Sequence, residues 1–470
     1  MNQDEPVLSK LANVAAGEVP PEVIVGIPAR ILDIVGIAVR ATTLDTSRAA
    51  TEFAVDQGTN QQATAIGAGV RLSAAEAAFV NGVLAHSLDY DDTHLPSILH
   101  PSAPVVPAAL AMAQWRDSSG SELLAAVAVG LEIAVRLGMG GYDVEGRQSI
   151  YFERGQHATS ICGAVGAAAA ASRLIDRSPE LAQHAMGIAC SMASGIIEAN
   201  RAGGTVKRLH CGWAARAGVT AAQLAARGIT GPPTAIEGRF GLYEAFLGDR
   251  ANVAITVAGL GEEWEAARIF YKPYPANHFT HTAIDAAMAL RADGLHVDEV
   301  SSATLHVAPP TVRTIGDPIE TKRRPETGYQ AQFSGPYAVA AGLFGGGGLG
   351  VGLADFTDEL ARAEDRRAVM ARVSVAGDES LLDIYPNQFP ARLEVETRSG
   401  ERLYKEVLSN RGGSERPLTD GELAAKFADN VVGLIGDEAR DRLVTDFHGL
   451  DATESTRDIL AGLESISPVS

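Results

Sequence analysis

The chain contains few cysteines. Its 470 residues include only Cys162, Cys190 and Cys211, and no two of them have the CxxC spacing of a thiolate metal site. An odd number at these separations predicts neither a disulfide framework nor a thiolate metal centre, and free thiols are typical of a reducing compartment. We therefore expect a cytoplasmic protein.

Basic charge is also scarce. Lys and Arg together number 39 against 58 Asp and Glu, which gives a formal net charge of −19. Nucleic acids and anionic membranes both bind proteins through basic faces that replace counterions. The charge balance therefore argues against either as a partner, and it makes any local gathering of cations in this chain a candidate site.

Long hydrophobic runs are missing as well. The stretch 123–135 is interrupted by Glu132, and it is shorter than the ~20 apolar residues that a membrane-spanning helix needs. Residues 1–20 contain three acidic side chains and no basic cluster ahead of a long apolar run, so we do not expect a signal peptide.

The length favours two domains, and a hydrophobic content of 46% predicts a well-packed globular protein. Between Pro21 and about Leu260, apolar residues recur at helical spacing with breaks at Gly and Pro. The predicted helices there are Val23–Ala41, Ala74–Leu88, Ala103–Gln114, Ser121–Leu137, Ala164–Leu174, Pro179–Ala193 and Ala214–Ala226.

The pattern changes near residue 265, where a Pro-rich turn leads to a predicted helix, Thr282–Ala292, and then to runs that alternate as strands do. These strands are Thr304–Ala308, Arg372–Ala376, Arg392–Thr397 and Arg402–Glu406, and the tail is predicted to form helices at Thr419–Ile435, Glu438–Phe447 and Ser455–Leu463. We predict a mainly α fold: a large all-helical domain beginning with residues 1–265, a smaller α+β domain at 266–405, and C-terminal helices at 406–470 that return to the helical domain.

The first segment with chemical character is acidic. Asp89, Asp91 and Asp92 lie within four residues and repel one another at neutral pH, so they need a compensating partner. They could form a metal site from Asp91, Asp92, His94 and His100, although these lack a defined ligand spacing. They could also orient histidines, or form a solvated acidic loop.

Two further segments precede apolar helices. His157 lies at the mouth of an Ala-rich helix, where the positive helix end favours a neutral imidazole that can act as a base; it could equally be an N-cap or core residue.

Lys207, Arg208 and His210 follow a glycine turn. Cations at a helix start oppose the helix dipole, so either they are solvated or they bind an anion.

The last two segments lie in the α+β domain. Prolines in Tyr271–Pro275 stiffen the backbone and should present Lys272 and His278 in defined directions, whereas His281 is expected in the core of the next helix. Tyr337 lies in the segment that starts at Arg324, and it could be a proton donor or a wall of the core.

These five segments, in this order, resemble the MmgE/PrpD family, which includes 2-methylcitrate dehydratase, cis-aconitate decarboxylase and iminodisuccinate epimerase. The resemblance spans nearly the whole chain, to Ile384-Tyr385-Pro386. It implies a large helical domain and a smaller α+β lid with the active site between them. It also implies a homodimer that uses no metal or organic cofactor and acts on a small polycarboxylate.

The resemblance also implies the site residues. As catalytic residues we predict His100, His157, Lys207 and Tyr337, and as substrate-binding residues Asp89, Thr93, Arg208, Lys272, Asn277 and His278. Where the decarboxylase pattern has a histidine after Pro-Ala, this chain has Asn277, and His278 follows it. We expect the residues that match the family pattern to surround one cleft between the helical domain and the lid.

All reactions of the family form or quench negative charge on a carbon next to a carboxylate. Such a site must neutralise the carboxylate, for which Lys207 and Lys272 are suited, and must exchange a proton with the carbon, for which His100 and His157 are suited. The predicted function is therefore a lyase, a dehydratase or decarboxylase of a citrate- or aconitate-like acid. The alternatives are an epimerase and a binding protein that has lost turnover.

Overall fold

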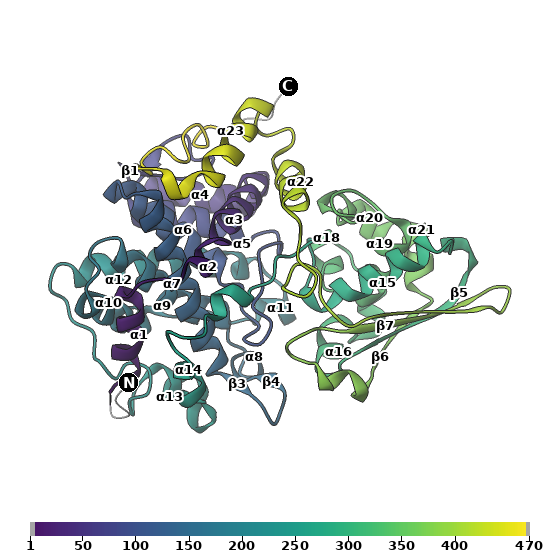
Figure 1. The fold of residues 1–470 in the computed structure, drawn as a ribbon. Helices are drawn as coiled ribbons and strands as arrows, with labels where there is room; N and C mark the ends of the chain where they lie inside the picture. Colours follow the sequence, from purple (N-terminus) through teal and green to yellow (C-terminus); the bar gives the residue numbers. More distant parts are fainter. Residues whose placement is uncertain (1–4, 467–470) are drawn as a thin grey trace. The chain divides into compact units, whose positions relative to one another are not determined.

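The computed structural model describes residues 5–466. This part of the chain forms two compact units, a helical unit of residues 5–269 and 427–466 and a mixed unit of residues 270–426 (Figure 1). The chain thus passes between the units after Ile269 and again after Lys426, whereas the sequence analysis placed these crossings after residues 265 and 405. The fold is mainly α, with a smaller α+β region.

Ten helices of ten or more residues lie in the described part of the helical unit. They are α1 (Val7–Ala16), α3 (Ile27–Ala41), α4 (Asp45–Asp56), α5 (Ala74–His86), α6 (Ser102–Arg116), α7 (Gly120–Met139), α9 (Ala158–Arg173), α10 (Pro179–Met192), α12 (His210–Ala225) and α23 (Asp437–His448). The shorter elements are α2 (Pro21–Ile24), α8 (Ile150–Glu153), α11 (Ala199–Ala202), α13 (Leu242–Leu247), α14 (Val253–Val257), and the 3-10 turns η1 (Val206–Leu209), η2 (Gly248–Arg250), η3 (Glu265–Arg268) and η8 (Leu450–Ala452). All seven helices predicted before residue 260 are helical in the structure.

Two details of the prediction need correction. The predicted helix Val23–Ala41 is two helices, α2 and α3, because Pro28 in the first turn of α3 has no N–H and is suited to a helix start. The helical unit also contains two small antiparallel hairpins, β1 (Thr59–Thr64) with β2 (Arg71–Leu72) and β3 (Tyr142–Asp143) with β4 (Gln148–Ser149), so it is not purely helical.

Glycines set how closely the central helices cross. A Cβ atom on Gly212 of α12 would lie 2.4 Å from the backbone oxygen of Phe79 in α5, and one on Gly166 of α9 would lie 2.4 Å from the oxygen of Gly130 in α7. Backbones can approach this closely only where no side chain intervenes. The first crossing fixes the end of α5 beside the start of α12, where histidines lie.

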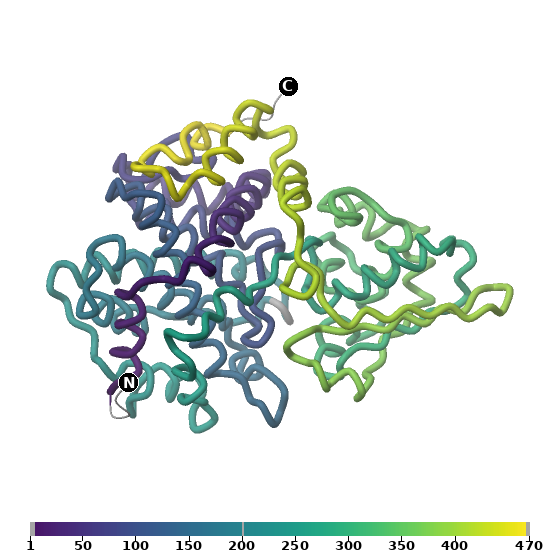
Figure 2. Tube along the Cα trace, viewed as in Figure 1, coloured from purple at the N-terminus to yellow at the C-terminus, as the bar shows by residue number. Residues whose placement is uncertain are grey.

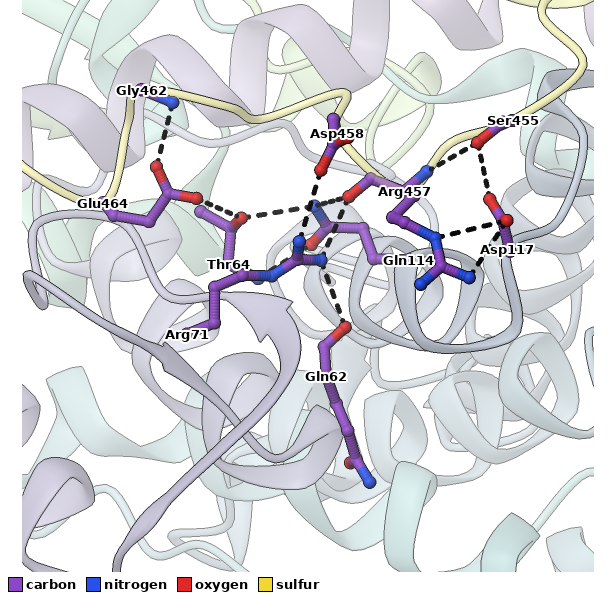
Figure 3. Close-up of polar contacts among 10 residues, drawn as sticks. All are labelled: Gln62, Thr64, Arg71, Gln114, Asp117, Ser455, Arg457, Asp458, Gly462 and Glu464. Atoms are coloured by element: carbon purple, nitrogen blue, oxygen red, sulfur yellow. Dashed lines mark hydrogen bonds and ion pairs between the residues drawn. The ribbon is translucent and has the colours of Figure 1, made fainter.

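The C-terminal segment returns to the N-terminal helices. Figure 2 shows its yellow trace beside purple and blue segments, and α23 packs on α3. In Figure 3 the guanidinium of Arg457 donates to Asp117, with Nη2 3.0 Å from Oδ2, and the hydroxyl of Thr64 donates to Glu464 at 3.0 Å. The backbone N–H and side-chain hydroxyl of Thr456 both donate to the carbonyl of Ser118 at 2.9 Å.

These contacts explain a wrong prediction. Residues 455–463 were expected to form a helix, but they form turns with i to i−3 bonds, such as Ile459 N–H to the Thr456 carbonyl. Tertiary hydrogen bonds hold this stretch against α6 and α7, so the chain does not close a helical ladder.

The mixed unit is built on one sheet. Its strands are β5 (Val300–Val307), β6 (Val373–Gly377), β7 (Ala391–Thr397) and β8 (Arg402–Val407), in the order β6-β5-β7-β8, with β5 and β6 parallel and the other pairs antiparallel. All four predicted strands are confirmed. In β7 the buried Leu393 and Val395 alternate with the exposed Glu394 and Glu396, the alternation that a sheet with one covered face requires.

Short helices accompany this sheet. They are α15 (His281–Ala292), α16 (Pro309–Ile315), α17 (Ile319–Lys322), α18 (Gly328–Ala331), α19 (Gly335–Phe344), α20 (Asp358–Arg362) and α21 (Glu364–Met370), with the 3-10 turns η4 (His278–Thr280), η5 (Val297–Glu299), η6 (Leu353–Asp355) and η7 (Glu379–Asp383). Helix α22 (Asp420–Val431) runs across the boundary between the units. Across residues 5–466, none of the helices combines the length and the apolar character needed to cross a membrane.

Candidate active site

Four histidines gather in the helical unit. The ring centroid of His86 lies 5.4 Å from that of His100 and 5.4 Å from that of His157, and the centroids of His157 and His210 are 5.0 Å apart. The rings of His86, His157 and His210 are buried, and His100 is half-buried. The cluster contains the two histidines predicted as catalytic, His100 and His157, and two that were not predicted as site residues, His86 and His210.

Helix ends bring these rings together. His86 is the last residue of α5, His100 stands two residues before α6, His157 is the N-cap of α9, and His210 is the first residue of α12. The starts of three helices therefore meet at the cluster. The positive ends of these helix dipoles favour an anionic ligand and disfavour further positive charge on the rings.

The acidic segment is buried beside the histidines. Asp89, Asp91 and Asp92 are at most 2% exposed, so the interpretation as a solvated loop is wrong. Nδ1 of His86 lies 2.8 Å from Oδ2 of Asp91. Asp92 accepts from Arg30 and from the Ser102 hydroxyl, both at 2.5 Å. Asp92 is thus compensated by a cation and a hydroxyl, and Asp91 holds a histidine.

The backbone after Asp91 orients His100. Nδ1 of His100 donates to the carbonyl of Asp92 at 2.7 Å, and the Thr93 hydroxyl lies 3.2 Å from the same nitrogen. Because Nδ1 carries the hydrogen, Nε2 of the neutral ring carries the lone pair. The His100 backbone N–H donates to the Thr159 hydroxyl in α9, which ties the two helix starts together.

The metal interpretation of the acidic segment does not match the contacts. His94 uses both ring nitrogens, with Nδ1 2.7 Å from the Ser97 hydroxyl and Nε2 3.2 Å from Glu265. Asp92 faces Arg30 and Ser102. In the described part of the chain, no group of three or more His, Cys, Asp or Glu side chains is arranged so that it could hold a metal ion.

The basic segment supplies charge to the cluster. Lys207 lies in η1 and is 9% exposed, and its charge lowers the pKa values of both His157 and His210. Arg208 is half-buried and donates to the Thr46 hydroxyl at 2.9 Å, which ties η1 to α4. Of the two cations, Lys207 is therefore the one that acts on the histidines.

His157 and His210 are held neutral. Burial lowers the pKa of His157 well below its usual value, and the charges of His86 and Lys207 lower it further. Burial, followed by the same two charges, lowers the pKa of His210 to about 4. Their Nδ1 atoms lie 3.0 Å apart, so one ring donates there and the other accepts, an arrangement that two imidazolium rings could not keep.

This neutrality predicts acid sensitivity. Lowering the pH from 7 to 5 protonates these histidines in the unfolded chain, where the pKa is about 6.5, but not in the folded protein, so the free energy of unfolding falls by about 2 kcal/mol per histidine. His210→Gln should therefore lose about 2 kcal/mol less over this interval, measured by urea unfolding at both pH values. His448→Gln, which removes an exposed histidine of α23, is the control. Equal losses in the wild type and in His210→Gln would contradict the prediction.

The other predicted site residues lie in the mixed unit. Lys272 is fully buried. The side-chain oxygen of Asn277 accepts the Phe279 N–H at 3.1 Å, and His278 is buried with its ring 4.3 Å from that of His281. His281 is 1% exposed, so its assignment to the core is confirmed.

Tyr337 is also buried in the mixed unit. Its hydroxyl donates to the carbonyl of Asp355 at 2.5 Å, and burial raises its pKa to about 12. The guanidinium carbon of Arg366 lies 5.7 Å from its ring centroid. A role as proton donor requires this hydroxyl to leave Asp355. The roles of Lys272, Asn277, His278 and Tyr337 stay predictions.

Three contributors were not among the catalytic or substrate-binding residues that the sequence analysis predicted. His86 and Asp91 form a pair, and His210 contacts His157 directly. The available signal for the pair was a histidine at the end of a predicted helix, followed five residues later by an aspartate. His210 was placed before the predicted helix Ala214–Ala226, but α12 begins at His210 itself and points this residue at α9.

Comparisons with known proteins show the family of the chain. Residues 8–254 match the MmgE/PrpD N-terminal domain and residues 274–447 match the MmgE/PrpD C-terminal domain. Together these matches cover most of the chain, which therefore belongs to the MmgE/PrpD family.

Similar curated proteins carry related names. The cis-aconitate decarboxylase of Homo sapiens is 27% identical over 93% of this chain and 89% of its own length. The cis-aconitate decarboxylase of Aspergillus terreus is 26% identical over 98% of this chain and 92% of its own length. A cis-aconitate decarboxylase-like protein of Aspergillus oryzae is 26% identical over 84% of this chain and 83% of its own length.

Proposed function

We propose that the protein is a lyase that decarboxylates a small tricarboxylic acid of the cis-aconitate type. The observation that carries the proposal is a histidine cluster in which His157 and His210 are held neutral beside the charge of Lys207, at the point where three helix starts meet. The names of the similar proteins support decarboxylation over the other reactions of the family.

The proposed reaction needs an anion site and a proton. The bond between a carboxylate and its carbon breaks, carbon dioxide leaves, and the electron pair moves through the neighbouring double bond onto a carbon next to another carboxylate. Lys207 binds that carboxylate and stabilises the charge that develops on it; a unit pair at 4 Å contributes about 4 kcal/mol at an effective dielectric of 20. His100 or His157 then delivers a proton to the carbon.

The environment of His157 suits this transfer. An imidazole held neutral by burial and by neighbouring positive charge becomes a strong acid as soon as it accepts a proton, and it passes that proton on readily. The same property suits the reverse step, removal of a proton next to a carboxylate. Dehydration of a 2-methylcitrate-like acid and epimerisation of an iminodisuccinate-like acid therefore remain chemically related alternatives.

A substrate panel tests the proposal. The purified protein is incubated with cis-aconitate, citrate, 2-methylcitrate and iminodisuccinate in deuterium oxide and followed by ultraviolet absorbance and proton NMR. We expect cis-aconitate to lose carbon dioxide and to gain one deuterium. Turnover of another acid alone would assign a different family reaction. If the protein binds one of the acids but neither converts it nor exchanges its protons for deuterium, the protein is a binding protein and the proposal is overturned.

We further propose that the reaction needs no metal ion. The acidic segment uses Asp92 and His94 in bonds to Arg30, Ser102, Ser97 and Glu265, and the chemistry above draws on a lysine and histidines. Activity is expected to be unchanged after treatment with EDTA and gel filtration. Loss of turnover with recovery on adding one divalent ion would contradict this prediction.

Two further features of the family pattern are part of the proposal. We propose that the protein works as a homodimer, which light scattering after gel filtration tests. The free thiols of Cys162, Cys190 and Cys211 suit a reducing compartment, and we propose the cytoplasm as its location.

A further inference from the structure

His86 has a geometry that its neighbours in the cluster do not share. Its Nδ1 donates to the carboxylate of Asp91 at 2.8 Å, and its ring is 4% exposed. Its Nε2 is buried, and no hydrogen-bond partner for this atom occurs among residues 5–466. Leaving a buried ring nitrogen without a hydrogen-bond partner costs free energy. Such an atom therefore calls for an explanation, and a functional role in binding or passing a proton is one.

The position of the ring indicates which groups those are. His86 lies between His100 and His157, with both centroids at 5.4 Å. A small ring rotation or one water molecule can connect groups at this separation. The carboxylate of Asp91 takes up Nδ1, so Nε2 is the atom of this ring that faces the other groups of the cluster.

Several ionisable groups surround the cluster. The ionisable groups that face the cluster are the carboxyls of Asp89, Asp91 and Asp92, the rings of His100, His157 and His210, the ammonium of Lys207 and the thiol of Cys211, with Arg30 behind Asp92. A charge on His86 lowers the pKa values of both His157 and His210. Burial raises the pKa of Cys211 well above its usual value, so the thiol stays neutral.

We propose that His86, held by Asp91, is the proton store of the site and supplies the proton that His157 or His100 delivers to the substrate carbon. In each turnover the proton leaves Nε2 of His86, passes through the neighbouring ring to the carbanion, and is replaced from solvent. His86 acts through another ring, so it is a positioning and proton-storing residue. This inference rests on the proposed function and extends it.

Two variants remove different parts of the pair. His86→Gln removes the titrating ring, and Asp91→Asn keeps an acceptor for Nδ1–H but removes the charge that stabilises the imidazolium. We expect both to lower kcat by roughly 10- to 100-fold with KM changed little, the size of effect typical of impaired proton transfer.

The pH profile separates this role from a structural one. The wild-type kcat should fall as the pH rises and His86 loses its proton. This fall in kcat is the alkaline limb of the pH profile. In Asp91→Asn the alkaline limb should move to lower pH, and in His86→Gln it should disappear. The matched control is Glu265→Gln, which neutralises the carboxylate of another buried pair, with His94, whose ring nitrogens are both bonded. It should leave the limb in place, whatever it does to stability.

A second measurement needs no substrate. The ¹⁵N resonances of labelled histidines report the charge of each ring in the free protein. We expect His86 to stay charged to higher pH than His157 and His210, and we expect Asp91→Asn to reverse this order or abolish the difference. If His86 is neutral wherever His157 is neutral, or if both variants keep the wild-type alkaline limb, the proton store is overturned. If the wild type turns over no acid of the panel, the proposed function fails while the ¹⁵N titration still decides the proton store.

Discussion

His157→Ala is expected to lower kcat by a factor of roughly 10² to 10⁴ while KM changes less. The reason is that His157 is buried and neutral and is proposed to transfer a proton only in the transition state, so its loss should affect the chemical step more than binding. Steady-state kinetics with the acid identified by the substrate panel measure both constants.

The control for this prediction is His448→Ala. It removes an exposed histidine of α23 whose Nδ1 contacts the Val444 carbonyl, so kcat should stay at the wild-type value. Circular dichroism of both variants checks that the helical unit is folded. If His157→Ala keeps near-normal turnover, His157 is structural and the proton transfer belongs to His100, Tyr337 or His278.

Lys207→Ala should change both kinetic constants. The ammonium group is proposed to contact a substrate carboxylate before and during the reaction, so its removal raises KM and lowers kcat, with a combined loss in kcat/KM on the order of 10². Lys207→Arg keeps the charge but replaces a compact ammonium with a planar fork, and we expect only partial rescue.

A second lysine provides the comparison. Lys405 pairs with Asp293 at 3.1 Å on the surface of the mixed unit, and Lys405→Ala should leave both constants unchanged. An unchanged KM in Lys207→Ala would show that this lysine does not bind substrate. Its influence on the pKa values of His157 and His210 would then be its main contribution.

Much of the secondary structure could be predicted from local patterns. Apolar stretches of helical length located α5, α6, α7 and α10, and two-residue alternation located β7 and β8. The failures have local explanations. Pro28 divides a continuous apolar pattern into α2 and α3, and residues 455–463 have a helical pattern but bond to Ser118 and to other groups of the helical unit.

The site could be predicted in part. His100 and His157 were predicted as catalytic residues from the resemblance to the family, and both lie in the histidine cluster. Lys207 was selected as a cation in an acidic chain, and it is buried where its charge acts on two histidines. The carboxylates were expected to need partners, but the partners of Asp92, namely Arg30 and Ser102, come from α3 and α6.

The amino-acid sequence by itself determined the mainly α fold, the order of helices and strands, and the segments in which acidic, basic and histidine side chains collect, because these depend on residues close in the chain. Only the tertiary structure decided that His86 pairs with Asp91 and that His210 meets His157. The contact of His210 with His157 depends on the packing of α12 against α9, where a Cβ atom on Gly218 would lie 2.6 Å from the backbone nitrogen of Ala168, so that only a residue without a side chain lets the two backbones approach. A local pattern contains no information on which distant glycine faces which backbone, and that meeting sets the charge and orientation of each ring.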